Sequence, residues 1–430
     1  MQSDALSQLS SLSSDQLQAL ASALTTEYQA HKDKGLKLDL TRGKPSSEQL
    51  DLSDALDGIL NGDYTTANGT DARNYGGIDG ISELKALGAE ILDVKPEQIL
   101  VGGNASLALM FQAVMQAHVF GFNGPESAWN KETTVKFLCP VPGYDRHFSI
   151  CETFGIEMVT VPMTATGPDM DQVEAMIKAD SQIKGIWCVP KYSNPTGVVY
   201  SDDTVKRIAE LAKIAGPNFK VFWDNAYIVH DLTDTPKTLA NIMSLAEAAG
   251  TEDSILQFCS TSKISHAGAG VAFLNASTAN LATFKKLLGI GTIGPDKVNQ
   301  LRHAKLFPTV DALKAHMKKH AEILQPRFEC VLKHLNEAFG DNTLGAWESV
   351  EGGYFISFDT QPGLASKVVT LAAEAGVKLT PAGATFPYGK DPEDKNIRIA
   401  PSVPTMDEVD AAMAIFVTCV QLATVEQQLG

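Results

Sequence analysis

Short apolar runs alternate with longer amphipathic segments over most of this 430-residue chain. Short apolar runs are typical of buried strands, and the segments between them have the spacing of surface helices. The alternation predicts an α/β fold, with a mainly parallel seven-stranded sheet and helices on both faces. The predicted strands lie at 98–101, 135–139, 158–162, 185–189, 221–223, 255–259 and 271–274.

The pattern changes after Gly294. Residues 310–339 form one long amphipathic pattern, and Pro326 within it is expected to kink the helix. Residues 346–430 combine two helical patterns with a few antiparallel strands, which favours a second, smaller α+β domain. The strands of this second domain are predicted at 354–358 and 397–400.

The N-terminal segment has the signals of one capped helix. Ser13 and Gln16 fit a capping box, the apolar positions that follow fall on one face, and Gly35 is a natural stop. A short strand is predicted at 36–40.

The charge balance argues against polyanionic partners. The chain has 35 Lys and Arg against 51 Asp and Glu, a net charge of −16, which disfavours nucleic acid and anionic membrane surfaces. No apolar run reaches the roughly 18 residues of a membrane span. The nearest case, 411–425, is interpreted as a terminal core helix.

Cysteine and histidine usage indicates a reduced protein without a metal. The six cysteines are scattered and include no CxxC pair, which is typical of core residues in a cytoplasmic protein. No basic residue precedes His31, so a signal peptide is not expected. The nine histidines show no metal-ligand spacing, so no metal site is predicted.

Lys263 stands where a buried strand, 255–259, is predicted to end. In open α/β sheets, ligands bind at the carboxyl ends of the strands. A desolvated lysine at this edge loses its proton more easily and can form a Schiff base with a carbonyl. The hydroxyls of Ser260 and Ser262 are placed to hold a phosphate beside it. The alternative is a solvated loop lysine.

Three other predicted strands end in polar or aromatic residues. Asn194 lies in an Asn-Pro-Thr-Gly turn, Asp224 and Tyr227 follow 221–223, and Tyr144 follows a Pro-Gly pair. Each has a structural alternative, namely a tight turn, a helix N-cap and simple packing. All of them would open onto one edge of one sheet.

A possible anion site follows the strand at 98–101. Gly102 and Gly103 lead through Asn104 and Ala105 to Ser106, which opens an apolar helix. Backbone N–H groups and the helix dipole at such a start attract anions, although many helices begin after glycines.

These groups match the needs of pyridoxal 5′-phosphate. That cofactor needs an amine for its aldehyde, a carboxylate beside the ring nitrogen, donors for its 3′ oxygen and a cradle for its phosphate. In that order the chain offers Lys263; Asp224; Asn194 with Tyr227; and Ala105, Ser106, Ser260 and Ser262.

With these motifs the chain resembles the fold-type I pyridoxal-phosphate enzymes, and within them the class I aminotransferases. The resemblance covers nearly the whole chain. Its motifs are Asn194-Pro-Thr-Gly197, Asp224-x-x-Tyr227, Ser260-x-Ser-Lys263, Asn396-Ile-Arg398-Ile-Ala and the loop Tyr75-Gly-Gly-Ile-Asp-Gly80.

The resemblance implies a division into parts. Residues 1–48 would form an N-terminal arm and part of the small domain, 49–308 the large cofactor-binding domain, and 309–430 the interdomain helix and small C-terminal domain. It also implies a homodimer with shared active sites, in which Tyr75 reaches the neighbouring subunit's phosphate.

The resemblance also implies roles for single residues. Tyr144 would stack on the cofactor ring, Asn104 would join the phosphate cradle, and Arg398 would bind the substrate α-carboxylate. The segments 41–46 and 262–268 look closest to an atypical aspartate aminotransferase subgroup. One departure stands out, because the family's usual phosphate-binding arginine is replaced by the Gly268–Val271 stretch.

His266 is the nearest titratable base to that departure. It either meets the phosphate with a raised pKa or only caps the glycine turn.

The predicted function is amino transfer between L-aspartate, or another acidic amino acid, and 2-oxoglutarate. Arg42 and Lys44 flank Gly43, which the resemblance places near the substrate, and they are the favoured bases for a second carboxylate. Arg146 and Arg302 are less favoured. The alternatives are an aromatic or aliphatic aminotransferase, a carbon–sulfur lyase, and a non-catalytic cofactor-binding regulator.

Overall fold

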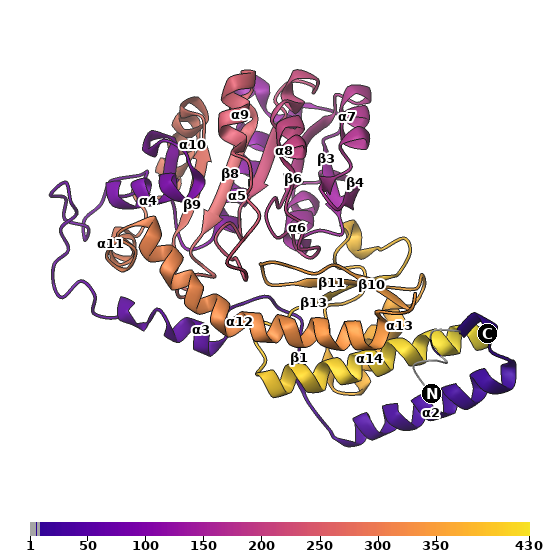
Figure 1. Cartoon of the computed structure of the whole chain (residues 1–430). Helices are drawn as coiled ribbons and strands as arrows, with labels where there is room; N and C mark the ends of the chain where they lie inside the picture. Colours follow the sequence, from indigo (N-terminus) through magenta and orange to yellow (C-terminus); the bar gives the residue numbers. More distant parts are fainter. Residues whose placement is uncertain (1–5, 7–8) are drawn as a thin grey trace.

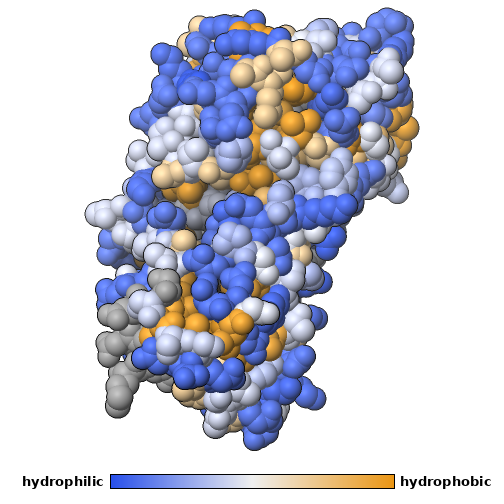
Figure 2. Space-filling view, turned by 90° about the vertical axis from the view of Figure 1, so that its right-hand side faces the viewer, coloured by the Kyte–Doolittle hydropathy of each residue, from blue (hydrophilic) through white to orange (hydrophobic). Residues whose placement is uncertain are grey.

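The computed structural model describes Leu6 and residues 9–430, arranged as an upper and a lower lobe in Figure 1. Residues 1–5 and 7–8 of the predicted N-terminal arm lie outside the described part. The upper lobe is built on a large sheet, and the lower lobe combines helices with two small sheets. Figure 2 shows hydrophilic side chains over much of one side of the molecule, with apolar patches on both lobes.

The upper lobe contains the predicted sheet, and all seven predicted strands are present. Strands β3, β4, β6, β7 and β8 pair in parallel, while β9 runs antiparallel to both of its neighbours. A two-residue strand, β5, was not predicted and pairs with β4 at one edge. The order is β2 (Ile99–Val101), β9 (Ala272–Ala276), β8 (Ile255–Ser260), β7 (Lys220–Asp224), β6 (Ile183–Cys188), β3 (Lys136–Val141), β4 (Glu157–Thr164) and β5 (Gly167–Pro168).

Both faces of this sheet are buried under helices, as the continuous apolar strands predict. Along β7, Phe222 joins one apolar core, whereas Val221 and Trp223 on the opposite face join another. The first core includes α5 (Ser106–Met115), α6 (Asp145–Thr153) and α10 (Thr278–Gly291), and the second includes α7 (Met170–Ala179), α8 (Asp202–Ala209) and α9 (Ile242–Ala249). Helices α4 (Ser82–Leu92) and α11 (Lys297–Leu306) cover the β2–β9 end.

The lower lobe is assembled from both ends of the chain around one apolar core. Helix α2 (Ser14–Asp33) has the predicted capping box, in which Ser13 and Gln16 satisfy each other's backbone N–H groups. The other elements are β1 (Leu38–Asp39) paired with β12 (Val377–Lys378), the antiparallel sheet of β10 (Gly345–Trp347), β11 (Ile356–Thr360) and β13 (Asn396–Ile399), and the helices α3 (Ser47–Asp51), α13 (Ala365–Glu374) and α14 (Met406–Leu429).

Helix α12 (Val310–Phe339) runs through both lobes and changes direction along its length in Figure 1. Pro326 lies inside it, and a proline removes one backbone hydrogen bond and crowds the preceding turn. Before the proline, Leu313 and Met317 pack in the core under β2 and β9. After it, Phe328 and Leu335 pack in the core of the lower lobe. The helix therefore passes from one core to the other close to its proline.

Helix α14 is long and apolar enough to cross a membrane by length and composition alone. However, 67% of its most apolar window is buried inside the protein. Its apolar residues, including Val409, Met413 and Phe416, pack in the lower-lobe core, as the terminal core helix predicted here should.

Candidate active site

The candidate site lies at the carboxyl ends of β6, β7 and β8. Asp224 is the last residue of β7, Lys263 lies just beyond the end of β8, and Asn194 lies in the turn that follows β6. Because β7 pairs in parallel with both β6 and β8, these three strand ends open onto one edge of the sheet.

Asp224 is a buried carboxylate with only one of its oxygens paired. Its side chain is 3% exposed, and Oδ2 lies 3.1 Å from Nε2 of His147 on α6. The His147 ring stacks on Trp187 of β6, with centroids 4.3 Å apart. Within the described part of the chain, Oδ1 of Asp224 has no hydrogen-bond partner. A buried acceptor of this kind suits a protonated ring nitrogen.

The amine of Lys263 lies beside an aromatic ring. Its Nζ lies 4.9 Å from the centre of the Tyr227 ring. Burial lowers the pKa of Lys263, and the nearby negative charge of Asp224 opposes this shift without cancelling it. Burial also raises the pKa of Tyr227, and burial together with Asp224 and Asp145 raises the pKa of Tyr144 to about 12. The site therefore makes the neutral form of the lysine easier to reach and disfavours ionisation of the two phenols.

Arg398 reaches this edge from β13 in the lower lobe. Its Nη1 donates to Oδ1 of Asn194 at 3.2 Å and to Oδ1 of Asp145 at 3.1 Å, and its Nη2 lies 3.4 Å from Oγ1 of Thr380. The guanidinium lies 4.8 Å from the centre of the Phe355 ring. Its buried Nε has no partner among the described residues. The arginine is thus held in place by three of its five N–H groups, and its Nε–H stays unpaired.

The segment around Gly43 lies against the same arginine. A Cβ added at Gly43 would lie 2.4 Å from the Phe355 ring, so only glycine allows this close approach. The carbonyl of Thr41 accepts a 3.0 Å hydrogen bond from Thr380. Arg42 and Lys44 therefore flank the glycine that packs on Phe355, the ring beside Arg398, and Arg42 forms no ion pair within the described part of the chain.

The predicted phosphate cradle is assembled from two loops. The Ser262 hydroxyl donates to the carbonyl of Asn104 at 2.6 Å, and Ser260 Oγ lies 3.2 Å from Ser262 Oγ. Ala105 is the N-cap of α5 and supplies no capping side chain. The first N–H groups of α5, which begins at Ser106, therefore stay available to an anion.

Two residues considered for a phosphate contact, His266 and Tyr75, do not face this chain's own cradle. Nε2 of His266 lies 3.6 Å from Oδ1 of Asp54, so its imidazole is directed to that carboxylate. Tyr75 is 81% exposed on the loop before α4, and within one chain its side chain faces solvent.

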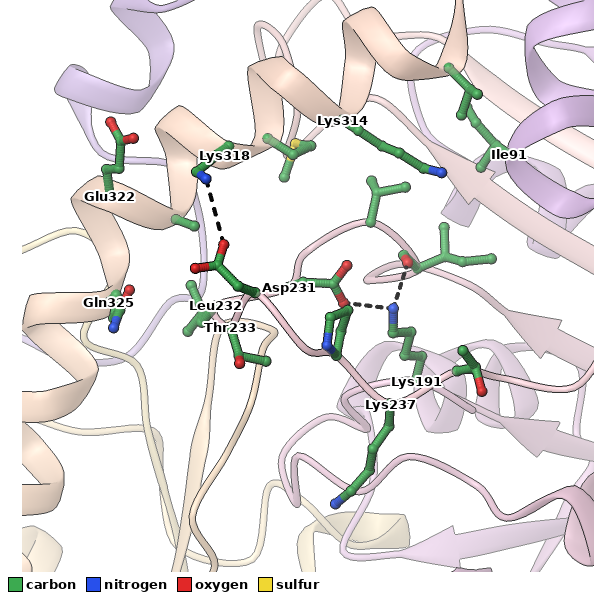
Figure 3. A pocket seen from close by; sticks show the side chains of 18 of the residues that line it. Ile91, Lys191, Asp231, Leu232, Thr233, Lys237, Lys314, Lys318, Glu322 and Gln325 are labelled. Carbon is green, nitrogen blue, oxygen red and sulfur yellow. Dashed lines mark hydrogen bonds and ion pairs between the residues drawn. The ribbon is translucent and has the colours of Figure 1, made fainter.

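A separate hollow of about 800 Å³ lies behind the site, between α12 and the loop that follows Tyr227 (Figure 3). Lys191 Nζ donates there to the carbonyl of Ile228 at 3.1 Å and to Asp231 Oδ1 at 2.6 Å. Lys314 reaches into the hollow from α12. None of the predicted site residues lines it. The Lys191 hydrogen bonds instead connect the loop that carries Asn194 to the loop that follows Tyr227.

Four residues that complete the site were not identified from the sequence. They are His147, Asp145, Thr380 and Phe355, which contact Asp224, Arg398 or Gly43. His147 carried a usable signal, because it lies one helical turn after Tyr144. Asp145 begins the same helix as His147, whereas Thr380 and Phe355 come from other segments and show no local pattern.

The sequence profile of the aspartate amino-transferase family matches residues 12–430. A protein from Corynebacterium glutamicum named aspartate aminotransferase is 50% identical over 396 residues, covering 92% of this chain and 91% of its own. A putative aminotransferase from Mycolicibacterium smegmatis is 48% identical over 98% of this chain and 99% of its own.

Solved structures support the same family assignment. An aspartate transaminase from Corynebacterium glutamicum superposes with a TM-score of 0.94 at 47% identity, covering 97% of this chain and 98% of its own. An alpha-aminoadipate aminotransferase from Thermus thermophilus, complexed with N-(5′-phosphopyridoxyl)-L-leucine, shares the fold with a TM-score of 0.73 at 20% identity, covering 93% and 95%. The chain is therefore an aminotransferase and belongs to the aspartate aminotransferase family, within the pyridoxal-phosphate-dependent class I aminotransferases.

Proposed function

We propose that this chain transfers the amino group between L-aspartate, or another acidic amino acid, and 2-oxoglutarate, as a cytoplasmic homodimer. The proposal rests mainly on the buried Oδ1 of Asp224, which has no hydrogen-bond partner among the described residues. It lies at the same sheet edge as Lys263, an amine with a lowered pKa. Arg398 reaches that edge through Asn194. The Corynebacterium glutamicum relative named aspartate aminotransferase supports the choice of substrate. The six unpaired cysteines are compatible with the cytoplasm.

The residues at the sheet edge fit pyridoxal 5′-phosphate. When bound, this cofactor supplies an aldehyde for an amine and an electron-withdrawing pyridinium ring. Lys263 would hold the aldehyde, and the free oxygen of Asp224 would keep the ring nitrogen protonated. The remaining contacts would come from Asn194 and Tyr227 to the 3′ oxygen, Tyr144 to the ring face, and Asn104, Ala105, Ser106, Ser260 and Ser262 to the phosphate.

Proton transfer is assigned to Lys263. A lysine whose pKa is lowered by burial carries a free electron pair on Nζ for a larger fraction of the time. That nitrogen would take up the proton that leaves the substrate α-carbon. Tyr227, whose ring lies 4.9 Å from Nζ, limits the directions in which the amine can point.

Arg398 and Arg42 are assigned to the two carboxylates of the substrate. The free Nε of Arg398 and its neighbouring Nη donors form a fork for the α-carboxylate, with Asn194 fixed beside it. Arg42 and Lys44 flank Gly43, and neither has an ion-pair partner among the described residues; of the two, Arg42 is assigned to the second carboxylate. It would meet the distal carboxylate of a dicarboxylic substrate.

A homodimer would bury an unusual exposed surface. Tyr75, Ile290 and Ile293 are 81%, 85% and 63% exposed. Gly294 packs directly on Gly76, and the Gly76 carbonyl accepts a 2.6 Å hydrogen bond from Lys297, so the Tyr75 loop lies beside the two isoleucines. Large apolar side chains grouped on a surface mark an interaction site. Covering them would place Tyr75 at a neighbouring subunit.

The backbone of Lys263 is held by side chains from both lobes. Its carbonyl lies 3.3 Å from Nε2 of His230 and accepts a 3.3 Å hydrogen bond from the hydroxyl of Tyr354. The Tyr354 hydroxyl accepts in turn from Gln49 at 3.0 Å. Because Tyr354 belongs to the lower lobe and His230 to the upper, the position of the lysine depends on both.

Two further histidines extend this network along α12. Nε2 of His316 lies 2.8 Å from the carbonyl of Ile264 and 3.1 Å from Nε2 of His320, and Nδ1 of His320 lies 3.0 Å from Nε2 of Gln49. Burial, followed by the charge of Lys263, lowers the pKa of His230 to about 3, and burial, followed by His316, lowers the pKa of His320 to about 4. These histidines therefore stay neutral near pH 7.

The first prediction tests Lys263. Lys263→Ala should fold, show no turnover and retain no cofactor after borohydride reduction, because the amine that bonds the aldehyde is gone. Lys191→Met is the control, since Lys191 is buried nearby but already donates to Ile228 and Asp231. Mass spectrometry of the reduced proteins measures the label, and labelled Lys263→Ala would overturn the assignment.

The second prediction tests the lysine's backbone anchor. Tyr354→Phe removes one hydrogen bond to the Lys263 carbonyl, and losing about 1 kcal/mol of alignment should lower kcat about fivefold. The pH titration of the lysine–cofactor absorbance should also shift. Tyr28→Phe is the control, because it loses a buried 2.9 Å hydrogen bond to Leu371 far from the site. Equal effects of both variants on the titration would show that Tyr354 acts only on stability.

The third prediction tests substrate choice with a panel of amino donors. Arg42→Ala should raise KM for aspartate and glutamate about tenfold or more, because one charged contact is lost, and should spare alanine and phenylalanine. Lys37→Ala, an exposed basic residue on the same segment, should change neither. If aromatic or aliphatic donors are preferred by the unmodified protein, or if it releases a thiol from sulfur amino acids, the alternative enzymes apply. No turnover of any donor indicates a regulator.

The fourth prediction tests shared sites. A heterodimer of Lys263→Ala and Tyr75→Phe chains has one intact site, so mixing equal amounts should restore about a quarter of the sites after random exchange. Analytical ultracentrifugation should show a dimer, and the mixture should exceed the activity of either parent. A fully active monomer would contradict the role of Tyr75.

A further inference from the structure

Three side chains with metal-ligand chemistry meet on the lower lobe, outside the active site. Cys330 and His334 belong to α12, and Asp410 belongs to α14. Oδ1 of Asp410 lies 2.9 Å from Nε2 of His334 and 3.9 Å from Sγ of Cys330. All three ligand atoms lie within 4.8 Å of one another.

The packing of the two helices sets this arrangement. Residues four apart on a helix share one face, so Cys330 and His334 project together toward α14. Val331 and Leu335 of α12 and Val409 and Met413 of α14 are each 0% exposed in one apolar core. The helix positions are therefore fixed by a packed interior and not by loops, so the three ligands are already gathered.

The distances suit a small tetrahedral cation. With zinc bonds of about 2.3 Å to sulfur and about 2.0–2.1 Å to nitrogen or oxygen, ligand atoms lie about 3.3–3.6 Å apart. The His334–Asp410 and Cys330–Asp410 distances, 2.9 Å and 3.9 Å, fall on either side of that range. Small side-chain rotations would bring both distances into the range for zinc without moving the helices.

We propose that Cys330 Sγ, His334 Nε2 and Asp410 Oδ1 bind one divalent ion of the zinc class. A thiolate, an imidazole and a carboxylate together favour zinc, cobalt or cadmium, whereas magnesium and calcium prefer oxygen ligands alone. The His334 and Asp410 side chains are 20% and 68% exposed, so an ion can enter from solvent and water can take the fourth position.

Binding changes the protonation of the ligands. The Cys330 thiol releases its proton to solvent as Sγ bonds to the ion. The His334–Asp410 hydrogen bond opens, and the imidazole presents the unprotonated Nε2 to the ion while keeping its proton on Nδ1. Without an ion, the contacts of Asp410 with His334 and with Cys330 join the helices at this point.

The other cysteines do not compete for the ion. Of the six cysteines, Cys139, Cys151, Cys188, Cys259 and Cys419 are buried, and Cys330 alone is partly exposed. A thiolate signal from an added metal therefore reports on Cys330. Because the site lies away from Lys263 and its contacts, the bound ion should stabilise the lower lobe and leave transamination unchanged.

The fifth prediction uses Co²⁺ as the probe on the intact, cofactor-loaded protein. One equivalent should bind, giving a sulfur-to-cobalt charge-transfer band and intense visible bands typical of tetrahedral cobalt. Zn²⁺ should displace it and raise Tm by about 3 °C when present at a hundredfold excess over Kd. Difference spectra against Cys330→Ser remove the absorbance of the cofactor.

Variants separate a built site from chance binding. Cys330→Ser should abolish the charge-transfer band, and His334→Gln or Asp410→Asn should weaken binding at least tenfold. Asp407→Asn, an exposed carboxylate one turn earlier on α14, is the matched control and should bind normally. Cobalt bound without a thiolate band, binding equal in all variants, or no binding near one equivalent would each overturn the proposal.

Discussion

The candidate site depends on a buried carboxylate that has a hydrogen-bond partner on only one of its two oxygens. Removing an ionised group from water costs several kcal/mol unless partners replace the lost hydration. Asp224 is 3% exposed and has His147 on one oxygen and nothing on the other within the described chain. The fold places this acceptor at the end of β7, and the stacked His147 and Trp187 rings fix its direction. A cationic ring nitrogen would pair with the free oxygen. Cofactor binding would therefore also offset the desolvation cost of this carboxylate.

The site is completed only when the two lobes meet. Asp224, Lys263 and Asn194 belong to the sheet edge, whereas Arg398 and Tyr354 come from the lower lobe. The Arg398–Asn194 contact and the Tyr354–Lys263 contact each join a lower-lobe residue to the sheet edge. Substrate recognition and the orientation of the reactive amine are therefore coupled through a shared set of hydrogen bonds.

Much of this arrangement could be predicted from local sequence. Continuous apolar runs gave seven strands, and parallel strands bring their ends together, which grouped Lys263, Asp224 and Asn194 correctly at one edge. Strand β5 is too short for any periodicity to reveal it. His147, Asp145 and Tyr354 escaped notice because their partners lie far along the chain, where only tertiary packing decides the contact. The cluster of Cys330, His334 and Asp410 has no local motif either, because its third member belongs to a different helix, α14.

The proline in α12 has a mechanical consequence. Residues before Pro326, including His316 and His320, are anchored to the segment that carries Lys263, while those after it, including Phe328 and Leu335, are embedded in the lower-lobe core. The helix is held in both lobes, and it bends most easily where the proline interrupts its backbone hydrogen bonds. Rocking of the lower lobe would accordingly pivot about the middle of α12. Arg398 would then swing toward or away from the bound substrate, and the Tyr354–Lys263 hydrogen bond would pass part of that motion to the lysine.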